Sequence, residues 1–363
     1  MLSYTSAVTI ALDASPLTVS TGGVGRYTLE LALALAAEYP NDQYWLLSDQ
    51  AFPAPHAPPP NLHTGEGPRN QAERKWWLWG LEREMRRRGI TLFHGTDYSV
   101  PYLPLRPSVM TLHDLSPWMD PAWQPDAARV RRRTPRLLRM GLATMIITPT
   151  EAVRRAAIER FQLPPDRVVS VPLAAGELFR PVVPTANVAP YFLFVGTREP
   201  RKNIARLLEA WREVRRTSPI DLVLAGRARA DSPGIPQEPG LRVLGEVPDS
   251  ELPALYSGAR ACVYPSLYEG FGLPVLEAMQ CGALVITSRD PAIAEVSRGA
   301  ALHVDACDTP ALAEAMRAVA AEPGKFNELR HRAIERASEF TWRDTVRRTR
   351  EVYDAAARLF SHS

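Results

Sequence analysis

The sequence predicts an α/β protein with two domains, each built on a parallel β-sheet. Its 363 residues are a length typical of two domains. Short apolar runs alternate with longer amphipathic segments, which is the pattern of repeated strand–helix–strand units. A segment with three prolines and no periodicity, 176–190, separates the runs into two series and is typical of an interdomain linker.

The first series begins with apolar and β-branched residues at 8–12, which predict a buried strand. Helical periodicity follows at 26–38. The remaining strands of this series are predicted at 44–47, 92–94, 109–112 and 145–148, and a further helix at 152–161.

The second series begins after the linker with an apolar run at 191–195, which predicts its first strand. Further strands are predicted at 222–225, 261–264 and 284–287, and helices at 204–216, 250–257, 309–321, 325–338 and 342–360.

Composition predicts a soluble protein of a reducing compartment. A net charge of +3 is too small to indicate nucleic-acid binding by itself, and no apolar run is long enough to span a membrane. The three cysteines form no CxxC motif or cysteine–histidine cluster, which argues against disulfides and structural zinc. We therefore expect a cytoplasmic protein.

The segment 264–279 carries the clearest functional signal. A short apolar strand leads into a loop containing Gly270 and Gly272, and a helix follows at Pro274. Free backbone N–H groups at such a helix start can bind phosphate, and glycines allow close approach. Glu269 and Glu277 flank the turn and suit hydroxyl groups instead. A ligand with both phosphates and hydroxyls is a nucleotide sugar.

This loop, EGFGLPVLE, resembles the signature of the retaining family 4 glycosyltransferases of the GT-B fold, in which two glutamates flank a glycine-rich turn. The segment 194–203, FVGTREPRKN, resembles the second donor-site motif of that family. The segment 22–27 resembles its N-terminal loop, and His113 with Asp114 its mid-domain histidine. The motifs follow the family's order and cover nearly the whole chain.

The resemblance implies the GT-B fold, in which two Rossmann-like domains face each other across a cleft. It also implies that the C-terminal helix crosses back to the N-terminal domain. We expect an acceptor-binding domain at 1–180 with 342–363, and a donor-binding domain at 187–340. Ligands of open parallel sheets bind beyond the carboxyl ends of the strands.

The resemblance also implies roles for donor-site residues. Glu277 would bind the ribose hydroxyls, and Glu269 would lie at the donor sugar near the reacting carbon. Lys202 and Arg201 would stabilise the departing diphosphate in place of a metal ion. A solvated surface position remains the alternative for these two basic residues. The other residues assigned to donor binding are Gly196, Arg198, Gly270, Phe271, Gly272, Leu273, Gly22 and Gly23.

In the N-terminal half, the resemblance implies that His113 hydrogen bonds the transferred sugar, with a structural histidine as the alternative. We assign Gly25 and Asp13 to acceptor binding, with a flexible turn as the alternative for the glycine loop. His94 also ends a predicted strand, and we interpret it as structural.

Two basic segments suggest an anionic partner. Residues 74–88 mix tryptophans with arginines, and 129–139 contains six arginines. Such segments suit the inner surface of an anionic membrane or a pyrophosphate-linked acceptor. Buried tryptophans with solvated arginines are the alternative. We assign Arg131, Arg132 and Arg133 to the acceptor.

We therefore expect a metal-independent retaining glycosyltransferase without a cofactor. It would move a hexose from a nucleotide diphosphate sugar to a hydroxyl of a saccharide or lipid-linked acceptor. The EPRKN form of the second motif resembles bacterial mannosyl- and rhamnosyl-transferring members, which favours GDP-mannose as donor. The alternatives are a sugar-nucleotide epimerase and a non-catalytic nucleotide-sugar-binding protein. A nicotinamide-dependent oxidoreductase would need a GxGxxG turn that GGVG does not match.

Overall fold

The computed structural model describes residues 8–18, 22–183, 189–229, 232 and 234–362. The chain divides into two compact units. The first comprises Met1–Trp118, Asp126–Leu173 and Thr341–Ser363, and the second Met119–Pro125 and Ala174–Phe340. The short segment Met119–Pro125 thus lies with the second unit, although the chain on both sides of it belongs to the first.

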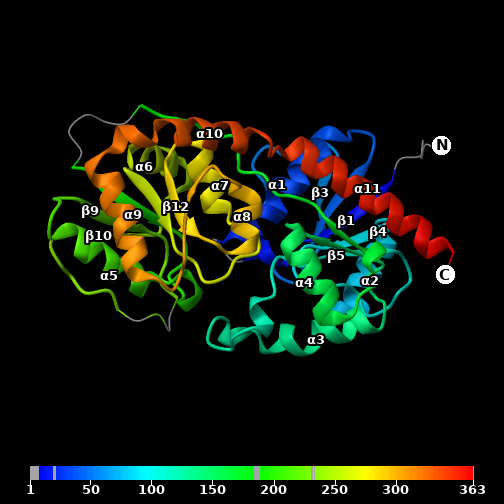
Figure 1. Ribbon diagram of the computed structural model, residues 1–363. Coiled ribbons are helices and arrows are strands. Elements are labelled where there is room, and N and C mark those ends of the chain that lie inside the picture. The colour runs from blue at the N-terminus through cyan, green and yellow to red at the C-terminus, as the bar shows by residue number, and fades with distance from the viewer. Residues whose placement is uncertain (1–7, 19–21, 184–188, 230–231, 233, 363) are drawn as a thin grey trace. The chain divides into compact units, whose positions relative to one another are not determined.

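The first unit is built on a seven-stranded parallel sheet with the strand order β3-β2-β1-β4-β5-β6-β7. Strands β1, β4 and β5 lie side by side in it (Figure 1). Its central strands are buried because helices cover the sheet. The strands are β1 (Thr9–Asp13), β2 (Gln43–Leu47), β3 (Leu62–Thr64), β4 (Leu92–Gly95), β5 (Ser108–Thr111), β6 (Met145–Thr148) and β7 (Val168–Ser170).

The last helix of the chain packs on this first unit. It contacts α1 (Gly23–Glu38), β5 and β6 and buries an apolar face that includes Val346, Val352 and Ala356. Thr341 caps its first turn, and the Thr345 hydroxyl donates to the Pro172 carbonyl at 2.8 Å. The predicted return of the C-terminal helix to the N-terminal domain is confirmed. The helices of this unit are α1 (Gly23–Glu38), α2 (Leu81–Arg87), α3 (Ala128–Arg139), α4 (Glu151–Phe161) and α11 (Trp342–Ser361).

The second unit has a six-stranded parallel sheet with the order β10-β9-β8-β11-β12-β13. The strands are β8 (Tyr191–Val195), β9 (Asp221–Ala225), β10 (Leu241–Gly245), β11 (Ala261–Tyr264), β12 (Val285–Ser288) and β13 (Leu302–Val304). The helices are α5 (Ile204–Arg215), α6 (Leu252–Gly258), α7 (Leu273–Gln280), α8 (Pro291–Ser297), α9 (Thr309–Ala321) and α10 (Asn327–Ser338).

Each sheet has a point where the strand order reverses direction. In the first sheet β2 and β3 lie in order on one side of β1, and the next strand in the chain, β4, lies on its other side. In the second sheet the corresponding neighbours are β8 and β11. Ligands of open α/β sheets bind beyond the carboxyl ends of the strands at such points, so a binding site is expected at the loops after these four strands.

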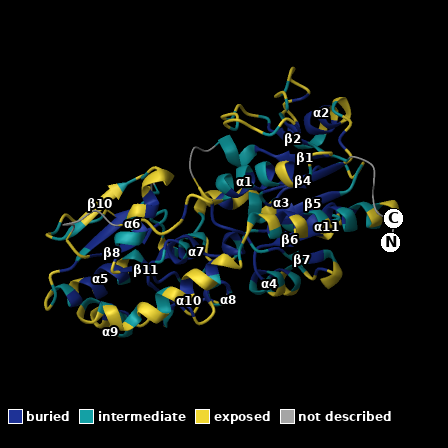
Figure 2. Ribbon diagram, turned by 90° about the horizontal axis from the view of Figure 1, so that it is seen from above, coloured by how far each residue is buried: buried dark blue, intermediate teal, exposed yellow. Residues whose placement is uncertain are grey.

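The nine predicted strands are all present, with bounds shifted by at most one residue. The sequence did not predict β3, β7, β10 or β13, which are the edge strands of the two sheets. Edge strands keep one side toward solvent and so lack a continuous apolar run; β10 is partly exposed, whereas β8 and β11 are buried (Figure 2). The predicted α/β class with two parallel sheets is confirmed.

None of the helices in the described part of the chain is both long and apolar enough to cross a membrane.

Candidate active site

A buried cluster of ion pairs lies at the reversal point of the second sheet. Lys202 and Arg201 belong to a turn that follows β8, and Glu269 lies in the loop after β11. The Lys202 Nζ is 2.6 Å from Glu269 Oε1, and Arg201 Nη1 is 2.8 Å from Oε2. Each carboxylate oxygen therefore faces one cation. Lys202 and Glu269 are both buried.

The two cations determine the charge of Glu269. Burial would raise the pKa of this carboxyl, but Lys202 and Arg201 outweigh burial and lower the pKa to about 2. Burial and the neighbouring Arg201 lower the pKa of Lys202, while Glu269 opposes them. A carboxylate held ionised between two cations has little tendency to take a proton.

Further groups hold this cluster in position. Glu199 binds Arg201 Nε at 2.8 Å, and the Arg201 Nη1 donates to the Tyr268 carbonyl at 3.1 Å. The Tyr264 hydroxyl, at the end of β11, receives a hydrogen bond from Lys202. Arg201 and Lys202 are thus neutralised within the protein, and the sequence does not indicate that pairing.

Asp290 is a second group at this site that sequence reasoning missed. One of its oxygens accepts the Glu269 backbone N–H at 3.3 Å. The other caps α8 by accepting the N–H groups of Ala292 and Ile293. An aspartate directly before a proline is a helix-start signal, so its capping role could have been read from the sequence. Its contact with Glu269 could not.

Arg198 differs from the other two basic residues of its motif. Its Nε atom is buried and has no hydrogen-bond partner within the described residues. Its backbone N–H donates to the Arg227 carbonyl, which joins the loops after β8 and β9. Gly226 allows this junction, because a Cβ atom there would lie 2.1 Å from the Gly196 carbonyl oxygen. Buried polar atoms nearly always have partners, so Arg198 is a candidate ligand for an anion.

Glu277 lies in a different environment from Glu269. It is buried on α7, and its Oε2 accepts a hydrogen bond of 2.9 Å from the Tyr256 hydroxyl on α6. Burial, and then the charge of Glu277, raise the thiol pKa of Cys262 and Cys281. The two glutamates of the motif therefore have separate partners, and a role in ribose binding stays a prediction.

The glycine loop between the two glutamates ends at the start of α7. Gly272 is the N-cap with φ of +87°, a conformation that favours glycine. The Phe271 side chain is buried and packs edge-on against Phe340, so only its backbone is available to a ligand. Leu273 begins the helix, and Gly270 precedes Phe271. The loop thus presents backbone and no charged side chain.

The glycines near the N-terminus partly depart from the prediction. Gly22 precedes α1, but Gly23 is its first helical residue and Gly25 lies in its first turn. The predicted helix start at residue 26 was therefore wrong, and only Gly22 remains outside the helix. Their assignment to the donor phosphate and the acceptor stays a prediction.

His113 and Asp114 follow β5 and have distinct contacts. The His113 Nε2 donates to the Thr96 carbonyl at 2.7 Å, and its ring packs edge-on against Tyr27. Burial lowers the pKa of His113, which favours the neutral imidazole. Asp114 Oδ1 accepts hydrogen bonds from the Tyr98 hydroxyl and from Ser116, so Asp114 holds the loop.

His94 is part of a buried chain of hydrogen bonds. Its Nδ1 lies 2.7 Å from the Tyr353 hydroxyl, and its Nε2 lies 2.8 Å from the Thr111 hydroxyl, which also contacts Tyr27. Burial lowers the pKa of His94 to about 3. These contacts join α11 to the sheet and to α1, which agrees with a structural interpretation.

Asp13 and Asp97 lie at the reversal point of the first sheet. Asp13 ends β1, and its Oδ1 accepts from the backbone and hydroxyl of Ser15. Burial is the main reason that the pKa of Asp13 is raised to about 6. Asp97 follows β4, and its pKa is raised to about 7 by burial and by the charges of Asp13 and Asp114, with Arg133 opposing them. Sequence reasoning missed Asp97.

We expect Asp97→Asn to stabilise the protein at about pH 8 more than at about pH 5. Between the ordinary aspartate pKa and about 7, Asp97 is protonated in the folded protein but ionised in the unfolded chain, so the stability of the fold decreases as pH rises through this window. Asparagine does not ionise, so the variant does not lose this stability. Thermal unfolding at both pH values measures it, and Asp126→Asn, at an exposed position, is the matched control. An equal Tm shift at both pH values would contradict the assignment.

Arg131, Arg132 and Arg133 do not form one surface. Successive residues of a helix point about 100° apart, and of these three arginines only Arg132 is exposed. The Arg133 guanidinium lies 5.1 Å from the Trp77 ring centroid and interacts electrostatically with Asp13 and Asp97. The Arg133 side chain is therefore directed to the edge of the sheet.

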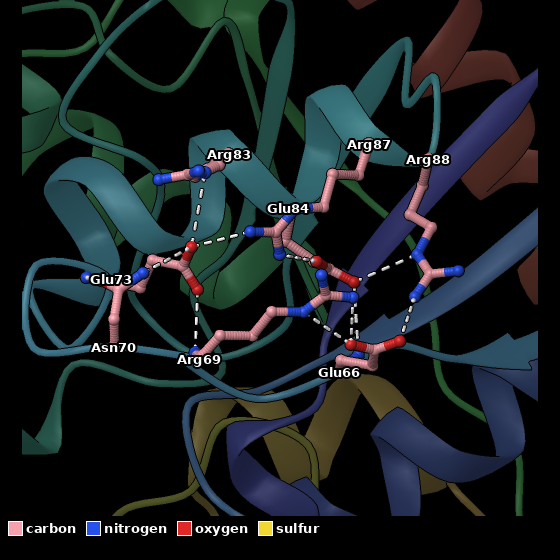
Figure 3. A network of polar contacts seen from close by, with 8 residues as sticks. All are labelled: Glu66, Arg69, Asn70, Glu73, Arg83, Glu84, Arg87 and Arg88. Carbon is pink, nitrogen blue, oxygen red and sulfur yellow. Dashed lines mark hydrogen bonds and ion pairs between the residues drawn. The ribbon is translucent and has the colours of Figure 1, made fainter.

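The arginines of the other basic segment are largely paired with carboxylates (Figure 3). Arg87 forms ion pairs with both Glu73 and Glu84, and Arg88 forms an ion pair with Glu84. Trp76 is buried in the core of the first unit, whereas Trp79 is 54% exposed. Much of the positive charge of this segment is therefore balanced within the protein.

No three histidine, cysteine, aspartate or glutamate side chains in the described residues lie close enough together to hold a metal ion.

Comparison with protein families finds two adjacent matches that together span most of the chain. Residues 21–175 match the family model "Glycosyltransferase Family 4", and residues 177–340 match "Glycosyl transferases group 1".

Two relatives from Escherichia coli are mannosyltransferases. O-antigen chain mannosyltransferase B is 34% identical over 285 residues, which cover 72% of this chain and 74% of the relative. Serotype-specific mannosyltransferase WbdA is 27% identical over 281 residues, covering 70% of this chain. The chain spans only 34% of WbdA, so it corresponds to about a third of that protein.

Solved structures share the fold at lower identity. Sucrose-phosphate synthase from Thermosynechococcus elongatus aligns with a TM-score of 0.73 and 22% identity, over 98% of this chain and 100% of that one. HepE from Anabaena, solved with UDP and glucose, aligns with a TM-score of 0.69 and 16% identity, over 96% and 99%. The predicted GT-B architecture and the family resemblance are confirmed.

Proposed function

Since the chain belongs to the family 4 glycosyltransferases of the GT-B fold, we propose that it transfers mannose from GDP-mannose to a hydroxyl of a saccharide acceptor with retention of anomeric configuration. The mannosyltransferase relatives and the EPRKN motif support mannose over other hexoses. The observation that carries the proposal is the buried Lys202–Glu269–Arg201 cluster beyond β8 and β11.

The proposed reaction exchanges one bond at the anomeric carbon. The bond from this carbon to the diphosphate breaks, and its electron pair leaves with GDP. The acceptor oxygen forms the new bond to this carbon, and its proton passes to the departing diphosphate oxygen. Because negative charge grows on the leaving diphosphate, cations placed there accelerate the step. We assign Arg198, Arg201 and Lys202 to that charge.

Glu269 is poorly suited to form a covalent intermediate. Both of its oxygens face cations, and its pKa of about 2 marks a weakly basic carboxylate. We therefore assign Glu269 to the binding of hydroxyl groups of the sugar. We also propose that the acceptor attacks the anomeric carbon from the same face that the diphosphate leaves. His113, with its neutral imidazole, is assigned to the transferred sugar.

The donor is tested by thermal shift with GDP-, UDP-, ADP- and dTDP-sugars. We expect stabilisation by GDP-mannose above the others, because binding to the folded state alone raises Tm. A larger shift with another nucleotide would replace the donor while leaving the reaction class intact. Product analysis without acceptor separates the transferase from an epimerase, which would isomerise the donor.

We expect transfer to survive EDTA, because Arg198, Arg201 and Lys202 supply the positive charge that a divalent ion would otherwise provide. The measurement is GDP release from GDP-mannose in the presence of acceptor, with and without chelator. Loss of activity that magnesium or manganese restores would show that this assignment of the basic residues is wrong.

A further inference from the structure

We propose that Asp97 and Arg133 form a subsite for a neutral saccharide acceptor at the reversal point of the first sheet, where one hydroxyl donates to Asp97 and a neighbouring hydroxyl accepts from Arg133. This inference rests on the proposed transferase function and names residues and ligand chemistry for its acceptor side.

The loops after β1 and β4 are joined at this point. β1 and β4 are parallel neighbours, with Leu12 opposite His94, so their carboxyl ends lie at one edge. The Thr96 hydroxyl donates to the Asp13 carbonyl at 2.7 Å, which fixes the residue before Asp97 against the end of β1. Asp97 therefore stands at the position where an open sheet binds its ligand.

Two polar atoms at this edge lack partners. The Asp97 Oδ1 and the Arg133 Nε are both buried and have no hydrogen-bond partner among the residues that the structure describes. The neighbouring carboxylates differ, since Asp114 and Asp13 each accept hydrogen bonds from nearby serines. Buried atoms without partners are rare and costly, so an acceptor and a donor left open together indicate a ligand with complementary groups.

The charges select the class of ligand. The negative charges of Asp13 and Asp114 act on Asp97, and Arg133 is the cation that acts on both Asp97 and Asp13. A phosphate would meet repulsion from these carboxylates, whereas a hydroxyl both donates and accepts and carries no charge. The ring of Trp77 lies under the Arg133 guanidinium and orients it. A sugar with adjacent hydroxyls fits these groups; a pyrophosphate does not.

The test is run at about pH 8, where Asp97 is ionised, and uses Asp97→Asn and Arg133→Gln. Arg139→Gln is the matched control because Arg139 is exposed on the same helix. The probes are a mannose disaccharide with a neutral alkyl group and the same disaccharide carrying a pyrophosphate. We expect each of the two variants to raise the acceptor KM at least about tenfold with either probe, since hydrogen bonds to charged groups contribute about 1.5–3 kcal/mol. The control should match the wild type.

Two further measurements, GDP affinity and hydrolysis of GDP-mannose by water, distinguish failure of the acceptor subsite from failure of the proposed transferase function. Both should be unchanged in Asp97→Asn and Arg133→Gln, because the donor site is intact. If the proposed function is wrong, the wild type will neither bind GDP nor hydrolyse GDP-mannose. Unchanged acceptor KM in both variants would overturn the subsite. An effect of Arg133→Gln confined to the pyrophosphate probe would also overturn it, because the site would then bind phosphate. Asp97→Ser serves as a second variant if Asp97→Asn alters folding.

Discussion

The double variant Arg201→Ala/Lys202→Ala is expected to lose at least about 100-fold in kcat. Removing a single preorganised group that stabilises developing charge typically costs about 100- to 1,000-fold. The structure adds a second consequence, because both substitutions leave the buried Glu269 without its cations. Breaking a buried pair in this way typically costs about 3–5 kcal/mol of stability.

A third substitution separates the lost catalysis from the lost stability. Adding Glu269→Gln to the double variant removes the unpaired charge, so Tm should recover while kcat stays low. Arg212→Ala is the control, because Arg212 forms an exposed ion pair with Glu238 elsewhere in the same unit. The measurements are Tm and single-turnover rates with saturating donor. Turnover near the wild-type rate in the double variant would show that Arg201 and Lys202 have a purely structural role.

Glu269→Gln and Glu277→Gln are expected to act on different parts of the donor. Glu277→Gln should weaken donor and free GDP alike by about tenfold or more, since a charge-assisted hydrogen bond to a ribose hydroxyl is lost. Glu269→Gln should reduce transfer about 100-fold and leave GDP affinity equal or higher, because it removes the negative charge that pairs with Lys202 and Arg201 and leaves Arg201 only its ion pair with Glu199. Calorimetry with GDP and kinetics of transfer measure the two effects.

Tyr256→Phe is the matched control for Glu277. It removes the hydroxyl that donates to the Glu277 carboxylate and leaves the charge in place, so GDP affinity should fall less than in Glu277→Gln. Equal losses of GDP affinity in Glu269→Gln and Glu277→Gln would refute the division of roles.

The inner strands and the donor motif could be predicted because they depend on local pattern. A strand buried on both faces, such as β8, is a continuous apolar run in any context. The glycine loop before α7 is equally local, since Gly272 must adopt a left-handed conformation beside a helix that starts with a proline in its first turn. The edge strands lack this signal, because β10 exposes most of its side chains.

By itself the sequence determined the class of fold, the order of its elements and the two segments that carry Lys202 and Glu269. Only the tertiary structure decided that these residues neutralise each other, because they lie 67 positions apart and meet only when β8 and β11 become neighbours. Asp97 and Arg133 come together in the same way, from the loop after β4 and from α3. Sequence periodicity reports which face of an element is buried, whereas charge pairing and open hydrogen-bonding atoms depend on which elements pack side by side.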